Sequence, residues 1–259
     1  MIRGLYTSGW SMLAIEKKMD IITNNMANVN TTAYKKDTVV FESFPEVLAK
    51  RINDTRSRLS PDGSVGNMQL GSDVGEVFTY YNQGQLQKTD NKLDMALRDS
   101  DSAFFTVTGM DLNGNEKEYY TRDGAFAIGA DNLLTTKEGY IVQGINGPIQ
   151  LYGESFSITT DGSIIQDGEV VDSLLIKEFT DTGTLRKAGN NLIEKTDQTE
   201  EGTFSGTVSQ GYLELSNVNI VKEMIDMITV TRAYEANQKI LQAQDGTLEK
   251  AVNEVGALR

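Results

Sequence analysis

Glycine is distributed very unevenly along this chain. Of its 24 glycines, none lies between Gly9 and Gly63, only Gly246 and Gly256 follow Tyr212, and 15 fall within residues 98–211. Helix interiors exclude glycine, whereas tight turns depend on it. The distribution therefore predicts helices at both ends of the chain around a turn-rich β region.

Apolar residues near the N-terminus recur with mostly alternating spacings of three and four, the pattern of a helix with one narrow apolar seam. The pattern predicts a helix over residues 9–29 that ends among the asparagines at 24–30, because asparagine competes with the helical backbone for hydrogen bonds. The seam consists of Leu5, Met12, Ile15, Met19, Ile22, Met26 and Val29.

Near the C-terminus, apolar residues recur every seven positions and predict a second helix, over residues 217–255. At 1.5 Å per residue it would be about 55–60 Å long, far beyond an ordinary globular helix. Such stripes often form a simple core, but two narrow seams at opposite ends favour pairing with each other and with neighbouring subunits. The second seam consists of Ile220, Met227, Tyr234, Leu241, Leu248 and Val255, with Met224 and Val252 partly filling a further stripe.

Short segments rich in β-branched and aromatic residues fill the middle of the chain, separated by turn residues. Three aspartate–glycine pairs, at 123–124, 161–162 and 167–168, are suited to hairpin turns because glycine accepts a positive φ. The pattern predicts an α+β fold with a mainly antiparallel β domain. The expected strands are residues 104–108, 118–122, 125–128, 140–143, 149–152, 155–159, 163–166 and 174–179.

Composition excludes several classes of function. The chain has no histidine and no cysteine, which removes the common triads, imidazole or thiolate zinc sites and disulfides. A formal charge of −13 opposes nucleic-acid binding, which needs a basic surface. No apolar run approaches the roughly 18 residues of a membrane span, and the N-terminus lacks the pattern of a cleaved secretory signal. We expect neither cofactor nor metal.

Two patterns could suggest other functions. Asp181-Thr182-Gly183-Thr184 matches the short signature of aspartic proteases, although it has no second copy and is also typical of an exposed turn. The pairs Tyr80-Tyr81 and Tyr119-Tyr120 could stack on sugars, but paired tyrosines in strands more often face opposite sides of a sheet. Trp10, the single tryptophan, could be core filler or an interface anchor.

Both ends of the chain resemble a known family. Residues 24–36 (NNMANVNTTAYKK) resemble the signature NNxANxNTxGYK of flagellar rod, hook and hook-associated proteins, with Ala33 in place of glycine. Residues 210–219 (QGYLELSNVN) and 232–237 (RAYEAN) resemble the C-terminal signature. Residues 83–105 and 120–126 (YTRDGAF) resemble the distal-rod (FlgG-like) branch, so the likeness spans nearly the whole chain.

The signature residues that we carry over are Asn25, Asn28, Asn30, Thr31, Tyr34, Lys35, Gln210, Gly211, Ser216, Asn217, Val218, Arg232, Ala233, Tyr234 and Glu235. The resemblance implies a structural subunit, not an enzyme, of the bacterial flagellar basal-body rod, polymerising helically into the drive shaft between motor and hook. It implies as partners further copies, other rod and hook proteins, and the flagellar type III export apparatus, which acts without a cleaved signal.

The resemblance also implies a domain plan: a discontinuous, coiled-coil-like helical domain (residues 1–32 and 216–259), an extended connecting segment (33–75) and an antiparallel β domain (76–215). Alternatives are a proximal-rod or hook-type subunit, a β-rich module that binds cell-wall glycan, and an aspartyl hydrolase built on Asp181.

Overall fold

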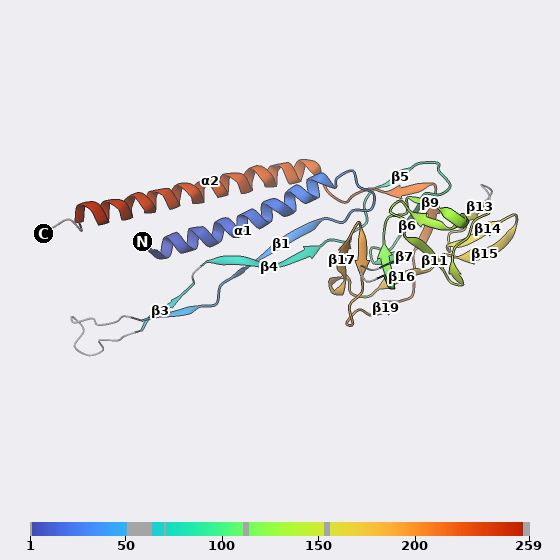
Figure 1. Ribbon diagram of the computed structural model, residues 1–259, viewed down its shortest axis with the longest axis horizontal. Helices are drawn as coiled ribbons and strands as arrows, with labels where there is room; N and C mark the ends of the chain where they lie inside the picture. The colour runs from blue at the N-terminus through green and yellow to red at the C-terminus, as the bar shows by residue number, and fades with distance from the viewer. Residues whose placement is uncertain (1, 51–63, 70, 111–113, 153–155, 256–259) are drawn as a thin grey trace. The chain divides into compact units, whose positions relative to one another are not determined.

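The computed structural model describes residues 2–50, 64–69, 71–110, 114–152 and 156–255. Within them the fold is α+β, with a helix near each end of the chain and a mainly antiparallel β region between (Figure 1). The chain divides into two compact units: residues 1–26, 37–78 and 221–259 form unit 1, and residues 27–36 and 79–220 form unit 2. Among the described residues, no helix is long and apolar enough to span a membrane.

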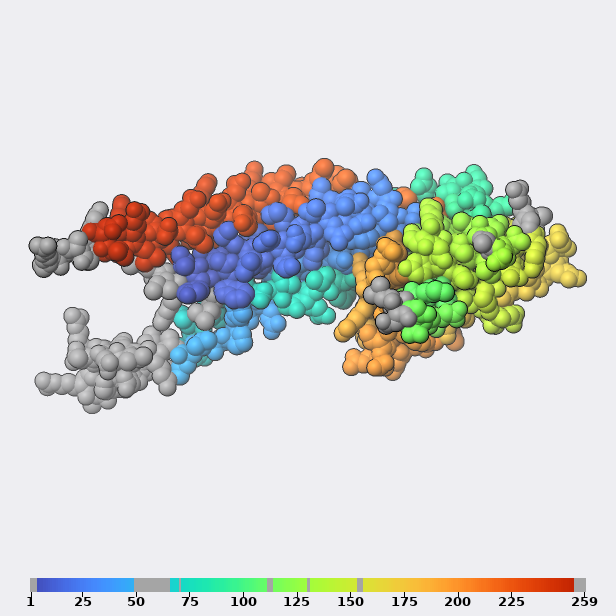
Figure 2. Space-filling view, viewed as in Figure 1, coloured from blue at the N-terminus to red at the C-terminus, as the bar shows by residue number. Residues whose placement is uncertain are grey.

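Unit 1 contains the two long helices. Helix α1 (Ile2–Ala27) begins earlier than predicted and ends among the expected asparagines, and α2 (Ile220–Lys250) continues into a π-helical turn, Ala251–Val255. The helices lie side by side and antiparallel (Figures 1 and 2): Gly4 on α1 faces Gln244 on α2, and Asn25 hydrogen-bonds Glu223. A methyl group at Gly4 would collide with the Gln244 side-chain amide, so the Gln244 side chain packs directly against the α1 backbone there.

Unit 1 also contains a β arm, in a region that was predicted only as an extended segment. Strand β1 (Asp37–Ser43) pairs with β4 (Ser72–Thr79), and β2 (Val47–Lys50) pairs antiparallel with β3 (Ser64–Met68). Trp10 of α1 contacts Phe44 edge-on, with ring centroids 5.0 Å apart, and its Cβ lies beside Gly71. Trp10 therefore packs against this arm while remaining 40% exposed.

Unit 2 is built on a sheet of ten strands, counted over the described residues, with the central order β17-β18-β8-β7-β11-β10-β9. Its strand pairs are antiparallel throughout the described residues. Its strands are β7 (Ala103–Met110), β8 (Glu116–Thr121), β9 (Phe126–Ile128), β10 (Leu134–Thr136), β11 (Ile141–Gly144), β12 (Gly147–Pro148), β16 (Ile176–Phe179), β17 (Arg186–Gly189), β18 (Leu192–Glu194) and β19 (Glu201–Gly202).

Three smaller sheets complete unit 2, and two of them connect segments far apart in the chain. Strand β5 (Leu86–Lys88) pairs with β21 (Tyr212–Glu214), and β6 (Met95–Arg98) pairs with β20 (Thr207–Gln210). Strands β13 (Phe156–Ile158), β14 (Ser163–Gln166) and β15 (Glu169–Ser173) form the third. Residues 207–214 are therefore integral to the β domain.

The core of unit 2 lies on both faces of the main sheet. Side chains alternate across a strand, so Phe105 and Phe104 of β7 point into different clusters. Tyr119 and Tyr120 divide in the same way, with 7% and 0% exposure. This confirms that the pair straddles a sheet and leaves neither ring free to stack on a sugar.

Most predicted strands are present, with two differences. Residues 149–152 form only an isolated bridge, between Gln150 and Leu133. The Asp123-Gly124 hairpin was wrong: Gly124 has no positive φ, and β8 and β9, which flank it, pair with other strands. Glycine is needed there because a methyl group would collide with the Met95 carbonyl oxygen. The pairs at 161–162 and 167–168 do have the expected positive φ, at Gly162, Asp167 and Gly168.

Candidate functional site: a buried ionic junction in unit 2

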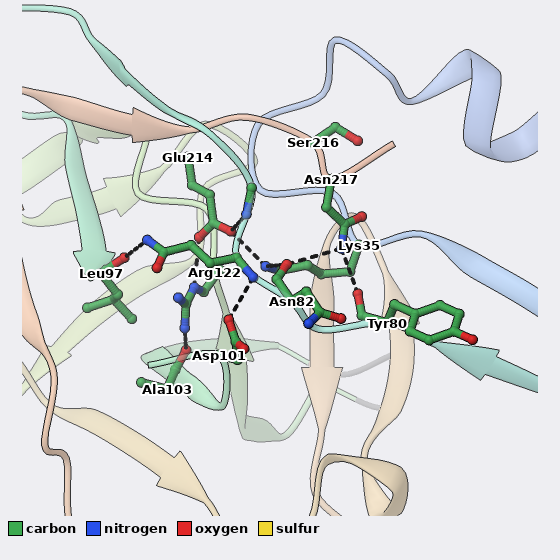
Figure 3. A network of polar contacts seen from close by, with 12 residues as sticks. Lys35, Tyr80, Asn82, Leu97, Asp101, Ala103, Arg122, Glu214, Ser216 and Asn217 are labelled. Carbon is green, nitrogen blue, oxygen red and sulfur yellow. Dashed lines mark hydrogen bonds and ion pairs between the residues drawn. The ribbon is translucent and has the colours of Figure 1, made fainter. Parts of the chain in front are cut away.

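The N-terminal and C-terminal signatures meet in unit 2 around the carboxylate of Glu214 (Figure 3). Lys35 Nζ lies 2.7 Å from Glu214 Oε1, and Arg122 Nε lies 2.8 Å from Oε2. The backbone N–H of Gly84 also donates to Oε1, at 2.7 Å. The three charged side chains are at most 3% exposed, so an ionic triad lies inside the domain.

Each cation of the triad has further partners. Lys35 Nζ donates to the Asn82 carbonyl at 2.8 Å, and the Arg122 guanidinium donates to the Ala103 carbonyl (Figure 3). The guanidinium also donates to the Ser100 carbonyl. Buried charges are tolerated when they are paired and hydrogen-bonded in this way. The triad thus connects the loop after α1, the loop before β5, the end of β8 and strand β21.

The electrostatics of the triad follow from burial and pairing. Burial by itself raises the pKa of Glu214, but Arg122 and Lys35 outweigh this effect, and the pKa lies below its usual value. Burial lowers the pKa of Lys35, and Glu214 only partly counters that shift. Because the cluster has two cations and one contacting carboxylate, Glu214 is the member whose loss would leave the most uncompensated charge.

Asn217 forms a second polar connection between the two signatures. Its Oδ1 accepts from the Lys36 N–H at 2.8 Å, and its Nδ2 donates to the carbonyls of Tyr80 and Asn82 at 2.8 and 3.1 Å (Figure 3). Backbone bonds lie alongside it, from Ala33 N to Glu214 O at 2.8 Å and from Asn217 N to Tyr34 O at 3.3 Å.

Residues 31–35 are also fixed by the main sheet. Thr32 Oγ1 donates to Asp123 Oδ2 at 2.8 Å, and Asn191 Nδ2 donates to the Thr32 carbonyl at 2.9 Å. Burial raises the pKa of Asp123, although the bonds from Ala125 and Thr32 oppose the shift. Ala33 has φ 55° at 4% exposure, so the residue that replaces the family glycine adopts the left-handed conformation.

Asn25 forms a separate polar contact, inside unit 1. It is 1% exposed, its Nδ2 donates to the Asp37 carbonyl at 2.8 Å and to Glu223 Oε2 at 3.3 Å, and its Oδ1 accepts from the Asp37 N–H at 3.0 Å. One side chain therefore connects the end of α1, the start of β1 and the first turns of α2.

The remaining signature residues are distributed as follows. Tyr34 and Val218 are buried. Asn28, Thr31, Gln210, Gly211, Ser216, Asn217, Ala233 and Tyr234 are half-buried, and Asn30, Arg232 and Glu235 are exposed. Gln210 and Gly211 close the β domain, since Gly211 exchanges backbone bonds with Thr89 and Asp94.

The predicted seam residues differ in burial. Ile22 is buried, and Leu5, Met12, Ile15, Met19, Met26, Val29, Met227, Tyr234, Leu241 and Leu248 are half-buried. Ile220, Met224 and Val252 are exposed, and the side chain of Val255 lies outside the described part of the chain. On α2 the buried Glu223 and Val230 fall on the seam face, and neither was among the predicted seam residues.

Asp181 lies where a turn residue should. Its carboxylate accepts from Gly183 N at 2.8 Å and caps the short 3₁₀ helix Thr182–Thr184 on the surface. Among the described residues, no group of three or more acidic side chains is placed to hold a metal. The candidate site is therefore the ionic triad, whose ion pairs hold separate segments of unit 2 together.

Comparison with known proteins gives the family. Residues 5–35 match the flagella basal body rod protein family, residues 101–171 the D1 domain of the flagellar hook proteins FlgE/F/G, and residues 209–254 the C-terminal region of the flagellar basal body rod FlgEFG proteins. The chain is 32% identical to the flagellar basal-body rod protein FlgG of Bacillus subtilis, over 98% of this chain and 99% of the relative.

The chain belongs to the flagellar basal-body rod and hook protein family. It is also 34% identical to FlgG of Buchnera aphidicola from Acyrthosiphon pisum, over 96% of this chain and 98% of the relative, and 28% identical to the B. subtilis flagellar hook-basal body complex protein FlhO over the full length of both. Proteins of this family are structural rather than enzymatic, so the buried junction is a structural site.

Arg122 and Glu214 lie inside the family motifs but are not among the predicted site residues. The available signal was a charged residue directly beside aromatic or aliphatic residues, as in Tyr119-Tyr120-Thr121-Arg122 and Tyr212-Leu213-Glu214-Leu215. A charge in such a position needs a buried partner.

Proposed function

We propose that this chain is a structural subunit of the flagellar basal-body rod, in its distal part, and that it polymerises helically into the shaft that transmits torque from motor to hook. The observation that carries the proposal is the likeness to FlgG rod proteins over nearly the full length of both chains. A proximal-rod or hook-type position is the alternative; the glycan-binding reading is not favoured, since Tyr119 and Tyr120 are buried.

Assembly is proposed to depend on the two terminal helices, with residues 1–32 and 216–259 as the assembly domain, 33–75 as the connecting segment and 76–215 as the β domain. The antiparallel contacts Gly4–Gln244 and Asn25–Glu223 support coiled-coil-like pairing, because both follow one register along the helices. Side chains on the seams would then pack within a subunit and against neighbouring copies.

Localisation to the basal body and contacts with other rod and hook proteins follow from the same family membership. Delivery through the flagellar type III export apparatus, without a cleaved signal, is part of the proposal.

The test compares Leu241→Asp with Gln242→Asp, because these neighbours on α2 are half-buried and exposed respectively. Both variants acquire the same charge, so only the seam position should matter. Each is expressed in a bacterium lacking its own distal-rod protein, and rods are examined by electron microscopy of isolated basal bodies. We expect rods with the parent chain and with Gln242→Asp, and none with Leu241→Asp.

Circular dichroism of the purified Leu241→Asp chain should show an intact β domain. A parent chain that builds no rods would contradict the proposed function. Rods built normally by Leu241→Asp would instead contradict only the role of the helix seams.

A further inference from the structure

Methionine is the only sulfur-containing residue type in this chain, which has nine methionines and no cysteine. Eight of them lie in the described residues, and five of these eight are on the two helices of unit 1. We call these five the helix methionines: Met12, Met19 and Met26 on α1, and Met224 and Met227 on α2. A reagent that oxidises sulfur therefore acts mostly on the helices of unit 1.

The register of the helix pair follows from two contacts between α1 and α2. Gly4 lies against the Gln244 side chain, and Asn25 hydrogen-bonds Glu223. The two α1 residues are 21 positions apart, and so are the two α2 residues. The antiparallel helices therefore keep one register from the first contact to the second.

In this register the helix methionines gather near one end of the pair. Those on α1 recur every seven residues, which keeps them on one side of the helix. Met224 and Met227 lie at the level of α1 residues between Met19 and Met26. Four of the five side chains thus fall within about two helical turns.

The helix methionines differ in burial from a methionine of the core. Met12, Met19, Met26 and Met227 are half-buried, and Met224 is 48% exposed. Met95, in the core of unit 2, is 0% exposed. A small reagent such as hydrogen peroxide reaches half-buried side chains, although they still contribute apolar surface to unit 1.

Oxidation of a thioether changes its polarity. Peroxide transfers one oxygen atom to the sulfur: an S–O bond forms, the O–O bond breaks and water leaves, so the sulfur is oxidised and the peroxide is reduced. The sulfoxide oxygen is a hydrogen-bond acceptor, and burying it without a donor is unfavourable. Asn25, the buried amide at this level, already donates from Nδ2 to the Asp37 carbonyl and to Glu223 Oε2. Both of its N–H groups are therefore in use.

We propose that the helix methionines are a reversible oxidation site, at which sulfoxide formation destabilises the helix pair of unit 1 and reduction restores it. The reagent is hydrogen peroxide or another oxygen donor, and methionine sulfoxide reductases reverse the reaction. The inference is independent of the proposed function, because its readout is the unfolding of unit 1 and not the assembly of rods.

The experiment treats the purified full chain with hydrogen peroxide and locates sulfoxides by mass spectrometry of peptides. Both long helices belong to unit 1, so far-ultraviolet circular dichroism in urea follows that unit, and the near-ultraviolet tyrosine signal follows unit 2. We expect sulfoxide at the helix methionines and at Met110, which is 78% exposed on β7, while Met95 stays unmodified. Unit 1 should then unfold at lower urea, and the midpoint of unit 2 should not move.

Two leucine variants separate the helix methionines from other effects of peroxide. Leucine has a similar volume and helix propensity but no sulfur. The five-leucine chain combines Met12→Leu, Met19→Leu, Met26→Leu, Met224→Leu and Met227→Leu, and its unit 1 should be insensitive to peroxide. Met110→Leu is the matched control and should respond as the parent does.

Treatment of the oxidised parent with both stereospecific methionine sulfoxide reductases should return the midpoint of unit 1 to its starting value. This measurement needs no variant, so it tests the site even if the five-leucine chain folds poorly. Four outcomes would overturn the proposal: an unchanged midpoint after complete oxidation of the helix methionines, an equal shift in the five-leucine chain, no oxidation of the helix methionines while Met110 is oxidised, or a shift that reduction does not reverse.

Discussion

Replacing Glu214 by glutamine should destabilise unit 2 more than any other single change in the ionic triad. Glutamine keeps the size of the side chain and can still accept from Gly84 N, but it removes the negative charge that Lys35 and Arg122 contact at 2.7 and 2.8 Å. Two buried cations then face each other without a compensating carboxylate. Breaking a buried ion pair by removing one partner costs about 3–5 kcal/mol, so we expect a loss of that order in the free energy of unfolding.

The other members of the triad should rank below Glu214. Lys35→Met leaves Glu214 paired with Arg122 and removes the excess positive charge, so its cost should be the smallest. Arg122→Met leaves a neutral Lys35–Glu214 pair but strips the Ser100 and Ala103 carbonyls of a donor, which places it between the two.

Urea unfolding can follow the two units separately. Trp10, the single tryptophan, lies in unit 1, whereas most tyrosines lie in unit 2 and dominate the near-ultraviolet circular dichroism. Glu116→Gln, at an exposed position of β8, is the matched control and should stay within about 0.5 kcal/mol of the parent. A Glu214→Gln chain whose tyrosine signal unfolds within 1 kcal/mol of this control would refute the reasoning.

Three further predictions follow from the described contacts. The pKa of Glu214 is lowered in the folded state, so its carboxylate stabilises unit 2 fully above the ordinary carboxyl pKa of 4.5. This stabilisation is lost as the pH falls through the folded-state pKa. In an acid titration, the free energy of unfolding of unit 2 should therefore fall less steeply in Glu214→Gln than in the parent. Gly124→Ala should destabilise unit 2 by about 1–3 kcal/mol, because the added methyl group collides with the Met95 carbonyl. Gly246→Ala, at an open position on α2, should instead stabilise the helix by about 0.5–1 kcal/mol. Thermal unfolding measures both changes. Asn25→Ala should cost unit 1 about 1–3 kcal/mol, because it removes the hydrogen bonds that the Asn25 side chain makes with the buried Glu223 and with the Asp37 backbone. Trp10 fluorescence in urea measures this loss.

The features predicted best from sequence are those with a strong local pattern. The α1 seam and the asparagine cluster predicted that the first helix ends within residues 24–30, and α1 ends there, at Ala27. The Asp167-Gly168 turn was predictable because a two-residue hairpin of this type requires positive φ at both positions. Features that depend only on residues close together in the sequence can therefore be predicted from it.

The β arm and the ionic triad were not predictable in the same way. Strands β2 and β3 carry exposed residues such as Val47 and Leu48, so they show no clear alternation of buried and exposed positions. Lys35, Arg122 and Glu214 are separated by 87 and 92 positions, and no local sequence pattern relates segments so far apart. A charged residue beside apolar residues indicates that it has a buried partner, but it does not indicate which residue that partner is.

The junction joins the two family signatures, because Lys35 belongs to the N-terminal one and Glu214 to the C-terminal one, and both lie in unit 2. Helix α1 ends at Ala27 and α2 begins at Ile220, and the segments next to them, residues 33–36 and 214–217, are bonded to each other directly. Because Glu214 contacts both Lys35 and Arg122, its carboxylate holds the segment that follows α1 and the segment that precedes α2 together inside unit 2. A charge pair is directional, so it selects one partner and one register where apolar contacts would accept several. The triad therefore fixes the register in which residues 33–36 and 214–217 meet in unit 2.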